Sequence, residues 1–185
     1  MSKEPQHQHM LWLWTVQTVD NLSGEIIREV TDKNLFVKGG RELALVDIFG
    51  LTASTPLIGG MVGASSTAAN VDQDRLIYEH IGNATRKILT NTSDAALTAA
   101  DVEDVVYVDP DSGVTFYKKL TVKYSYGTSD GNNGQPFREY GLNTAIALPA
   151  TPTSLSGIMG NRLVDTVSQQ KASNNTINIF CSCYT

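Results

Sequence analysis

A hairpin signal in the middle of the chain restricts the possible folds more than any other feature of the sequence. Asp109-Pro110-Asp111-Ser112-Gly113 has turn chemistry, because proline presets φ and glycine closes the turn. Val102–Val108 precedes this turn, and residues 114–126 follow it with apolar side chains at every second position, except for Lys118. A period of two indicates a strand with one buried face and one face that is wet or in an interface. One face holds Val114, Phe116, Leu120, Val122, Tyr124 and Tyr126.

The composition agrees with a β-rich protein of one domain. A length of 185 residues fits a single domain, and 18% charged residues is low for a soluble chain. Threonine, serine, asparagine and 15 glycines take the place of the missing charged residues, and this composition favours strands joined by turns. We predict a polar N-terminal arm over residues 1–10 and a single β-rich domain over residues 11–185.

Other segments supply further strands and one helix. Arg41–Phe49 is the best helix candidate, and Gly50 ends it. The predicted fold is therefore mainly β, a β-sandwich or a jelly-roll-like barrel, with one short α-helix at about residues 40–49. Strands are expected, besides the central hairpin, at 11–19, 25–31, 58–63, 76–81, 85–90, 137–142 and 161–164, with a last strand that runs to the C-terminus. Both faces of this last strand carry apolar or aromatic side chains, so we expect it to be covered on both faces.

The first predicted strand opens with the apolar run Leu11-Trp12-Leu13-Trp14. This run is far too short to cross a bilayer or to act as the core of a signal peptide. Trp12 and Trp14 fall on the same face of a strand, where they pack in the core or form a subunit interface, since tryptophan is favoured in interface hot spots. Our interface hypothesis consists of Leu11, Trp12, Leu13 and Trp14. We expect that deletion of residues 1–19 abolishes binding to the particle and leaves a folded domain.

The sequence argues against enzymatic, cofactor-dependent and nucleic-acid-binding functions. Its three histidines accompany no nucleophile motif, and His7 and His9 alone do not make a closed metal site. Ile58–Gly63 lacks the Lys-Ser/Thr of a phosphate loop, and the loops beginning at Asp109 and Asp130 lack the glutamate of a calcium loop. A net charge of −5 argues against a dedicated nucleic-acid binder. We predict no enzyme activity, cofactor, metal, nucleic acid or membrane partner.

Cys181 and Cys183 are the two cysteines of the chain, two positions apart. On an extended strand their side chains point to the same face, with Cα atoms about 6.5–7 Å apart. That separation is at or beyond the limit for a disulfide between them. The residues leave two interpretations open: a pair of buried strand thiols, or an intersubunit disulfide that joins neighbouring copies.

Short motifs along the chain resemble a family of small structural proteins of tailed-bacteriophage virions. An opening strand hairpin leads to Asn34-Leu35-Phe36-Val37-Lys38-Gly39-Gly40-Arg41 and a short helix. Further motifs are Glu139-Tyr140-Gly141-Leu142, Asn161-Arg162-Leu163-Val164 and the turn from Lys171 to Thr176. The sequence departs from the family at Asn143, where an aromatic residue is usual, and in its Cys-Ser-Cys-Tyr-Thr ending. These departures leave the position in the virion open.

The resemblance implies a non-enzymatic virion protein that self-assembles and docks on other virion proteins. We expect a capsid decoration, minor head or head-tail (collar) component, a homo-oligomer with a trimer favoured. The expected partners are further copies of itself and the major capsid protein or neck and tail proteins. Assembly would take place in the host bacterial cytoplasm. One alternative is a tail-fibre or receptor-binding component with a carbohydrate surface of Tyr117, Tyr140 and Tyr184. The other is a cellular β-barrel that binds a small ligand.

Overall fold

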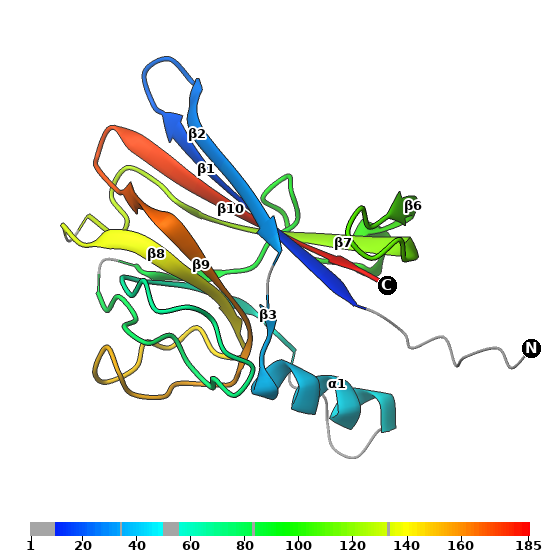
Figure 1. The fold of residues 1–185 in the computed structure, drawn as a ribbon. Helices are drawn as coiled ribbons and strands as arrows, with labels where there is room; N and C mark the ends of the chain where they lie inside the picture. The colour runs from blue at the N-terminus through cyan, green and yellow to red at the C-terminus, as the bar shows by residue number, and fades with distance from the viewer. Residues whose placement is uncertain (1–9, 34, 50–55, 83, 133) are drawn as a thin grey trace, which may run out of the picture.

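Two five-stranded antiparallel sheets form the protein, and the computed structural model describes residues 10–33, 35–49, 56–82, 84–132 and 134–185 (Figure 1). Sheet A contains, in spatial order, β2 (Ile26–Lys33), β1 (Leu11–Asp20), β10 (Asn175–Tyr184), β7 (Thr115–Tyr126) and β6 (Val102–Val108). Sheet B contains β3 (Leu35–Phe36), β9 (Met159–Gln170), β8 (Pro136–Asn143), β4 (Gly59–Gly63) and β5 (Arg86–Ile88).

The sheets pack face to face, which confirms the prediction of a β-sandwich; they do not close into the barrel that was its alternative. α1 (Lys38–Phe49) is the one α-helix among the described residues, and it begins two residues before the predicted start. It lies beside β9 at the end of sheet B (Figure 1). A single 3₁₀ turn, η1 (Ala99–Asp101), precedes β6.

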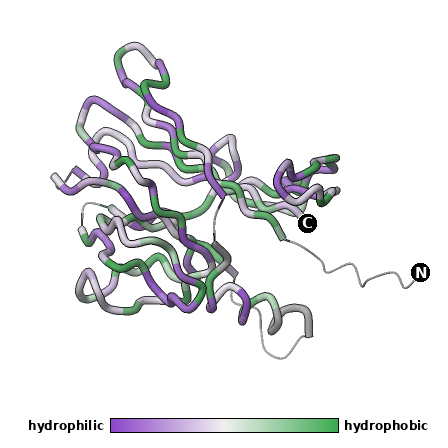
Figure 2. The backbone as a smooth tube through the Cα atoms, viewed as in Figure 1, coloured by the Kyte–Doolittle hydropathy of each residue, from purple (hydrophilic) through white to green (hydrophobic). Residues whose placement is uncertain are grey.

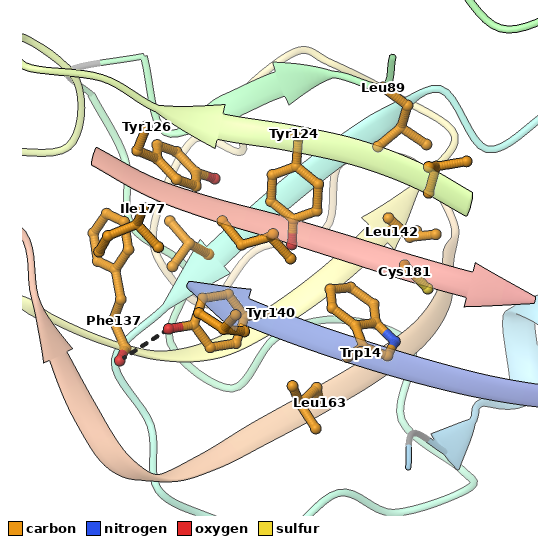
Figure 3. Close-up of a cluster of buried hydrophobic side chains, with 14 residues drawn as sticks. Trp14, Leu89, Tyr124, Tyr126, Phe137, Tyr140, Leu142, Leu163, Ile177 and Cys181 are labelled. Atoms are coloured by element: carbon orange, nitrogen blue, oxygen red, sulfur yellow. Dashed lines mark hydrogen bonds between the residues drawn. The ribbon is translucent and has the colours of Figure 1, made fainter. Parts of the chain in front are cut away.

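The core between the sheets is rich in aromatic side chains (Figure 3). Trp14, Tyr124 and Tyr126 come from sheet A, and Phe137 and Tyr140 come from β8. Edge-to-face contacts, which the ring quadrupoles favour, join Trp14 to Tyr124 and Tyr126 to Phe137. The hydroxyl of Tyr124 donates to the Met61 carbonyl of β4 at 3.2 Å, so this buried tyrosine also links the two sheets.

Gly60 shows why the strand of residues 58–63 is rich in glycine. A Cβ atom at this position would overlap the ring of Tyr124, which packs directly on the β4 backbone. Any larger residue would push the two sheets apart. The neighbouring Met61 points to the opposite face of sheet B, where it packs with Val37, Leu76 and Met159 in a second, smaller apolar cluster. Sheet B is therefore covered on both faces.

The predicted strand at Leu76–Ile81 is wrong. This segment makes one isolated bridge, between Glu79 and Gly63, and otherwise forms a loop over the outer face of sheet B. The backbone N–H groups of Ile77 and Tyr78 donate to the carboxylate of Glu139, at 2.8 and 3.0 Å. A buried side chain thus replaces the ladder that a neighbouring strand would have supplied.

The prediction that Phe116 shares a face with Val122 is also wrong, because β7 contains a bulge. The N–H groups of Tyr117 and Lys118 both donate to the carbonyl of Thr185, at 3.0 and 3.1 Å. The extra residue reverses the alternation of the strand. Phe116 consequently contacts Tyr184, whose side chain lies on the outer face of sheet A.

The last strand was expected to be covered on both faces, and the structure shows cover on one. Ile177, Ile179 and Cys181 are fully buried in the core. On the opposite face Asn178, Phe180 and Tyr184 are half-buried. β10 still has a neighbour at each edge, since it pairs with β1 and β7. It is the middle strand of sheet A.

β1 is also an interior strand, which changes what an N-terminal deletion would do. β1 pairs with β10 over its whole length and with β2 on its other edge, and Trp14 and Val16 are 0% exposed. We had expected that removal of residues 1–19 would leave a folded domain. The structure contradicts this, because the deletion removes part of the core.

We therefore predict that deletion of residues 1–19 abolishes cooperative unfolding, whereas deletion of residues 1–9 leaves it intact. The loss of Trp14 alone is expected to cost about 3–5 kcal/mol, a large part of the stability of a small domain. Circular dichroism during urea titration would measure both truncations. A cooperative transition in the shorter protein would contradict the prediction.

Candidate assembly surface

The predicted interface residues at the start of β1 contribute mainly to packing within the chain. Trp14 is 0% exposed in the core, and Trp12 is half-buried against the same cluster. Leu11 and Leu13 point to the opposite face of sheet A and are half-buried. Trp14 therefore offers no surface to a second subunit, and Leu11, Trp12 and Leu13 offer partly covered ones.

Cys181 and Cys183 are both free thiols on the inner face of sheet A. Cys181 is fully buried, and its Sγ accepts a hydrogen bond from Nδ2 of Asn161 at 3.7 Å. Burial raises the pKa of Cys183 to about 12, and raises the pKa of Cys181 as well. Because the thiolate is the reactive form, both thiols are held in an unreactive state at neutral pH. An intersubunit disulfide remains a hypothesis, and Cys183 is the better placed of the two.

The β6–β7 hairpin, residues 102–118, extends past the end of sheet B (Figure 1). Asp109 fixes its turn: the Asp109 N–H donates to the Val114 carbonyl at 2.8 Å, and Ser112 Oγ donates to the Asp109 carboxylate at 2.6 Å. Gly113 has a φ of +70°, which favours glycine. Nζ of Lys33, from β2, donates to the same carboxylate at 2.6 Å, and this contact lowers the pKa of Asp109 to about 2.

One face of the hairpin is buried by its own aromatic side chains. Tyr107 lies opposite Phe116 in the register, and the ring of Tyr107 lies 4.6 Å from the ring of Tyr184, measured between centroids. Phe116 is 3% exposed although it belongs to neither apolar cluster of the sandwich. The hairpin therefore has a small core of its own, and it is a fixed part of the fold.

The opposite face of the hairpin is apolar and exposed. Alternation places Val106 and Val108 opposite Tyr107, and places Tyr117 opposite Phe116, so the three side chains share a face. Their exposed fractions are 79% for Val106, 55% for Val108 and 62% for Tyr117. Figure 2 shows green apolar stretches in this hairpin, at a position far from the packed sheets. Clustered exposed apolar side chains of this kind mark contact surfaces.

β6 is also an edge strand, with β7 on one side and no strand on the other among the described residues. Its first half carries Glu103 and Asp104, which form ion pairs with Lys119 and Lys118 on β7. Charged residues and a bulge between Asp104 and Tyr107 are the usual protection of a sheet edge. Val105–Val108 carries no charged residue, although the bulge falls in its first half. We define the candidate assembly surface as the free edge of Val105–Val108 together with Val106, Val108 and Tyr117.

A buried ion pair holds the loop of residues 64–81 on the other side of the molecule. Glu139 and Arg162 have 0% exposed side chains, and the Arg162 guanidinium donates to the Glu139 carboxylate at 2.6 and 3.0 Å. The carboxylate also accepts the N–H groups of Ser65, Ile77 and Tyr78. The guanidinium also donates to the side chain of Gln73 and the carbonyl of Thr67.

A second ion pair holds the loop of residues 144–158. Arg86 and Glu79 form a bidentate pair at 2.5 and 2.9 Å, with both side chains almost fully buried. Nη1 of Arg86 also donates to the carbonyls of Ala145 and Ser156. This loop carries no charged residue, and its exposed apolar side chains make a second region suited to contact: Ile146, Leu148, Leu155 and Ile158.

Other site chemistries find little support in the described part of the chain. Tyr140 is 0% exposed and Tyr184 packs against Tyr107. Of the three tyrosines expected to form a carbohydrate surface, Tyr117 is therefore the one that is well exposed. No three His, Cys, Asp or Glu side chains among the described residues gather to hold a metal ion. His7 and His9 lie outside the described residues. No described helix is long and apolar enough to span a membrane.

Sequence reasoning missed the two buried ion pairs and the contact between Lys33 and Asp109. One signal was available for the first pair: Glu139 and Arg162 belong to two of the motifs that carry the family resemblance. The register places Gly141 opposite Arg162 and Leu142 opposite Asn161, so the two motifs are adjacent in space. Nothing in the sequence linked Glu79 to Arg86, or Lys33 to a turn 76 residues away.

Comparisons of the chain with known protein families, with curated proteins and with solved structures gave no match.

We predict that Glu139→Ala and Arg162→Met each lower the free energy of unfolding by about 3–5 kcal/mol, the range for breaking a buried ion pair. Glu139→Ala should be the more damaging, because it also leaves three backbone N–H groups without their acceptor. Urea denaturation would measure both values. Limited proteolysis should show new cleavage between residues 64 and 81.

The matched control for this pair is Lys118→Met, which breaks the exposed ion pair with Asp104. Exposed pairs contribute less than about 1 kcal/mol. A loss in Arg162→Met no larger than in this control would show that the buried pair does not hold the loop.

The burial of His80 leads to a prediction of how the free energy of unfolding depends on pH. Its side chain is 2% exposed, and burial lowers its pKa below the ordinary 6.5, although the Pro136 carbonyl at 3.0 Å acts in the opposite direction. Because the folded state takes up the proton less readily than the unfolded state, this contribution is fully present above pH 6.5. It is lost as the pH falls towards the lowered value.

We therefore expect the free energy of unfolding to decrease between about pH 6.5 and pH 5, before the carboxylates titrate. His80→Gln should flatten this part of the curve, which urea denaturation at a series of pH values would record. A wild-type curve that is already flat over this range would contradict the assignment.

Proposed function

We propose that this protein is a non-enzymatic structural component of a tailed-bacteriophage virion, which acts by self-assembly and by docking on other virion proteins. The observation that carries the proposal is the candidate assembly surface, where Val106, Val108 and Tyr117 are exposed beside a free strand edge. A rigid domain with an uncovered apolar edge is suited to contact with other chains.

The arrangement of the family-like motifs supports the same proposal. Glu139 and Arg162, from two of these motifs, form one buried network. A Cβ atom at Gly141, which lies opposite Arg162, would be 2.7 Å from Met61 Cε and 3.2 Å from the Asn161 carbonyl oxygen, so a side chain there would force Met61 to move. Two residues of the family-like motifs thus hold the loop of residues 64–81 on sheet B. Their role is structural, as expected of a virion component.

The assembly we propose is a homo-oligomer, with a trimer favoured because virion components occupy symmetry axes. The proposed partners are the major capsid protein or neck and tail proteins, and the proposed location is the virion, as a capsid decoration, minor head or collar component. The uncharged loop of residues 144–158 is a suitable second contact, since it would leave the assembly surface free for other copies.

We predict that the purified protein has a solution mass of three copies of the 20.0-kDa chain, and that antibodies against it label intact phage particles. Light scattering coupled to size-exclusion chromatography gives the mass, and electron microscopy of labelled particles gives the position on head, collar or tail. A monomer at all concentrations, together with unlabelled particles, would contradict the proposed function.

A further inference from the structure

The free edge of β6 has a composition that a lone protein rarely leaves uncovered. Val105-Val106-Tyr107-Val108 is a run of four residues with high strand propensity and no charge. It lies at the edge of sheet A, with Glu103 and Asp104 before it and Asp109 and Pro110 after it. Charged residues protect the ends of this edge, and its middle carries no charge, although a bulge between Asp104 and Tyr107 interrupts its regular pairing. An added strand would find backbone partners there and apolar side chains beside them.

The charges around this edge argue against the simplest occupant, the β6 strand of a second copy. Two β6 strands paired antiparallel about Val106 and Tyr107 would place Glu103 and Asp104 of each copy near Asp109 and Asp111 of the other. In this register Asp104 of each copy would lie opposite Asp109 of the other, and Asp104 is 85% exposed although it forms an ion pair with Lys118. Like charges opposite each other destabilise a strand pair. The better occupant is an extended segment without acidic residues.

The N-terminal arm contains such a segment. Residues 5–9 read Pro-Gln-His-Gln-His, with no acidic residue, and Glu4 is the single acid before them. Glutamine and histidine carry hydrogen-bond donors suited to the acidic ends of the β6 edge. A segment of nine residues can extend over about 30 Å, which is more than the length of Val105–Val108 requires.

The arm also starts at the correct end of the molecule. Leu11 pairs with Tyr184, Tyr184 with Lys119, and Lys119 with Glu103, so the first residue of β1 and the start of β6 share one row across sheet A. In Figure 1, β1 begins and β10 ends on the side that carries the β6–β7 hairpin. The arm therefore joins the domain beside the surface that it would occupy in a neighbour.

The strand order also favours the β6 edge of a neighbouring copy, rather than that of the same chain, as the binding site of the arm. From β1 to β6 the sheet order crosses β10 and β7, which is three strand spacings, or about 14 Å. The arm of the same chain would use roughly four or five of its nine residues to cross this distance sideways and would then have to turn. The arm of a neighbouring copy can approach along the edge itself.

We propose that the N-terminal arm of one copy adds as a strand, through residues 5–9, to the free edge of β6 in a neighbouring copy, covering Val106 and Val108. This inference rests on the homo-oligomer of the proposed function and supplies its linkage. Each copy gives one arm and accepts one arm. This head-to-tail contact is heterologous and closes a ring of three copies if the rotation between neighbours permits.

Two variants and a control test the linkage. The first variant begins at Met10 and so lacks the arm but keeps the β6 edge. The second is Val106→Lys, which keeps the arm and places a charge at a position that is 79% exposed, where the fold tolerates it. The matched control is Val167→Lys on β9, a valine that is 60% exposed and lies in the other sheet.

We expect the full chain and Val167→Lys to form the oligomer, and each of the two variants to have the mass of its own single chain. A mixture of the two variants should form a complex of one copy of each, because Val106→Lys can give an arm to the intact edge of the truncated protein. Light scattering measures all five samples, and circular dichroism verifies that each protein is folded.

The outcomes separate this inference from the proposed function. If the full chain assembles and either variant assembles equally well, the arm linkage is wrong and the proposed self-assembly stands. Two monomeric variants that fail to combine on mixing would also overturn the linkage. A full chain that is monomeric would overturn the proposed self-assembly together with the linkage.

Discussion

The buried contact between Glu139 and Arg162 is the interaction on which the covered face of sheet B depends. Removing two charges from water costs several kcal/mol per ion, which a pair recovers only when its remaining hydrogen-bonding capacity is satisfied. Here the carboxylate accepts from the guanidinium and from three backbone N–H groups, and the guanidinium also reaches Gln73 and Thr67. The pair thereby replaces the secondary structure that the loop of residues 64–81 lacks, and this loop in turn places Leu76 over Met61.

Apolar strand faces must be buried against other side chains, and this requirement also explains which side chains are buried in the β6–β7 hairpin. Sheet A is longer than sheet B, so the packing of the sandwich stops before the β6–β7 hairpin. The bulge at Tyr117 and Lys118 turns Phe116 towards Tyr107 and Tyr184, which gives one face of the hairpin a core of its own. Since alternate residues point to opposite faces, Val106, Val108 and Tyr117 are then left exposed. The assembly surface that we propose therefore follows from the way the hairpin buries its aromatic side chains on one face.

Much of the fold could be predicted from the sequence, because alternation and turn chemistry act over short distances. The hairpin through Asp109–Gly113, the helix near residues 40–49 and the sandwich class all followed from such local signals. The segment at Leu76–Ile81 could not be predicted, because its hydrogen bonds go to Glu139, which is about sixty residues away. Phe116 was assigned to the wrong face because a bulge that depends on Thr185, the last residue, leaves no local mark. The candidate assembly surface was missed for the same reason. The local sequence pattern around a valine in an alternating strand is the same whether or not a second sheet packs on that valine.

By itself, the sequence determined that this chain forms antiparallel strands with one apolar face, joined by turns such as Asp109–Gly113. These properties depend on residues that are neighbours in the chain, and the energies of turns and alternation act there. Only the tertiary structure decided which apolar residues are buried. Trp14 became part of the core because β1 lies between β2 and β10, whereas Val106 stayed exposed because β6 lies at the edge, beyond the end of sheet B. Burial depends on what lies opposite a side chain, and that is set by the pairing of strands far apart in the sequence.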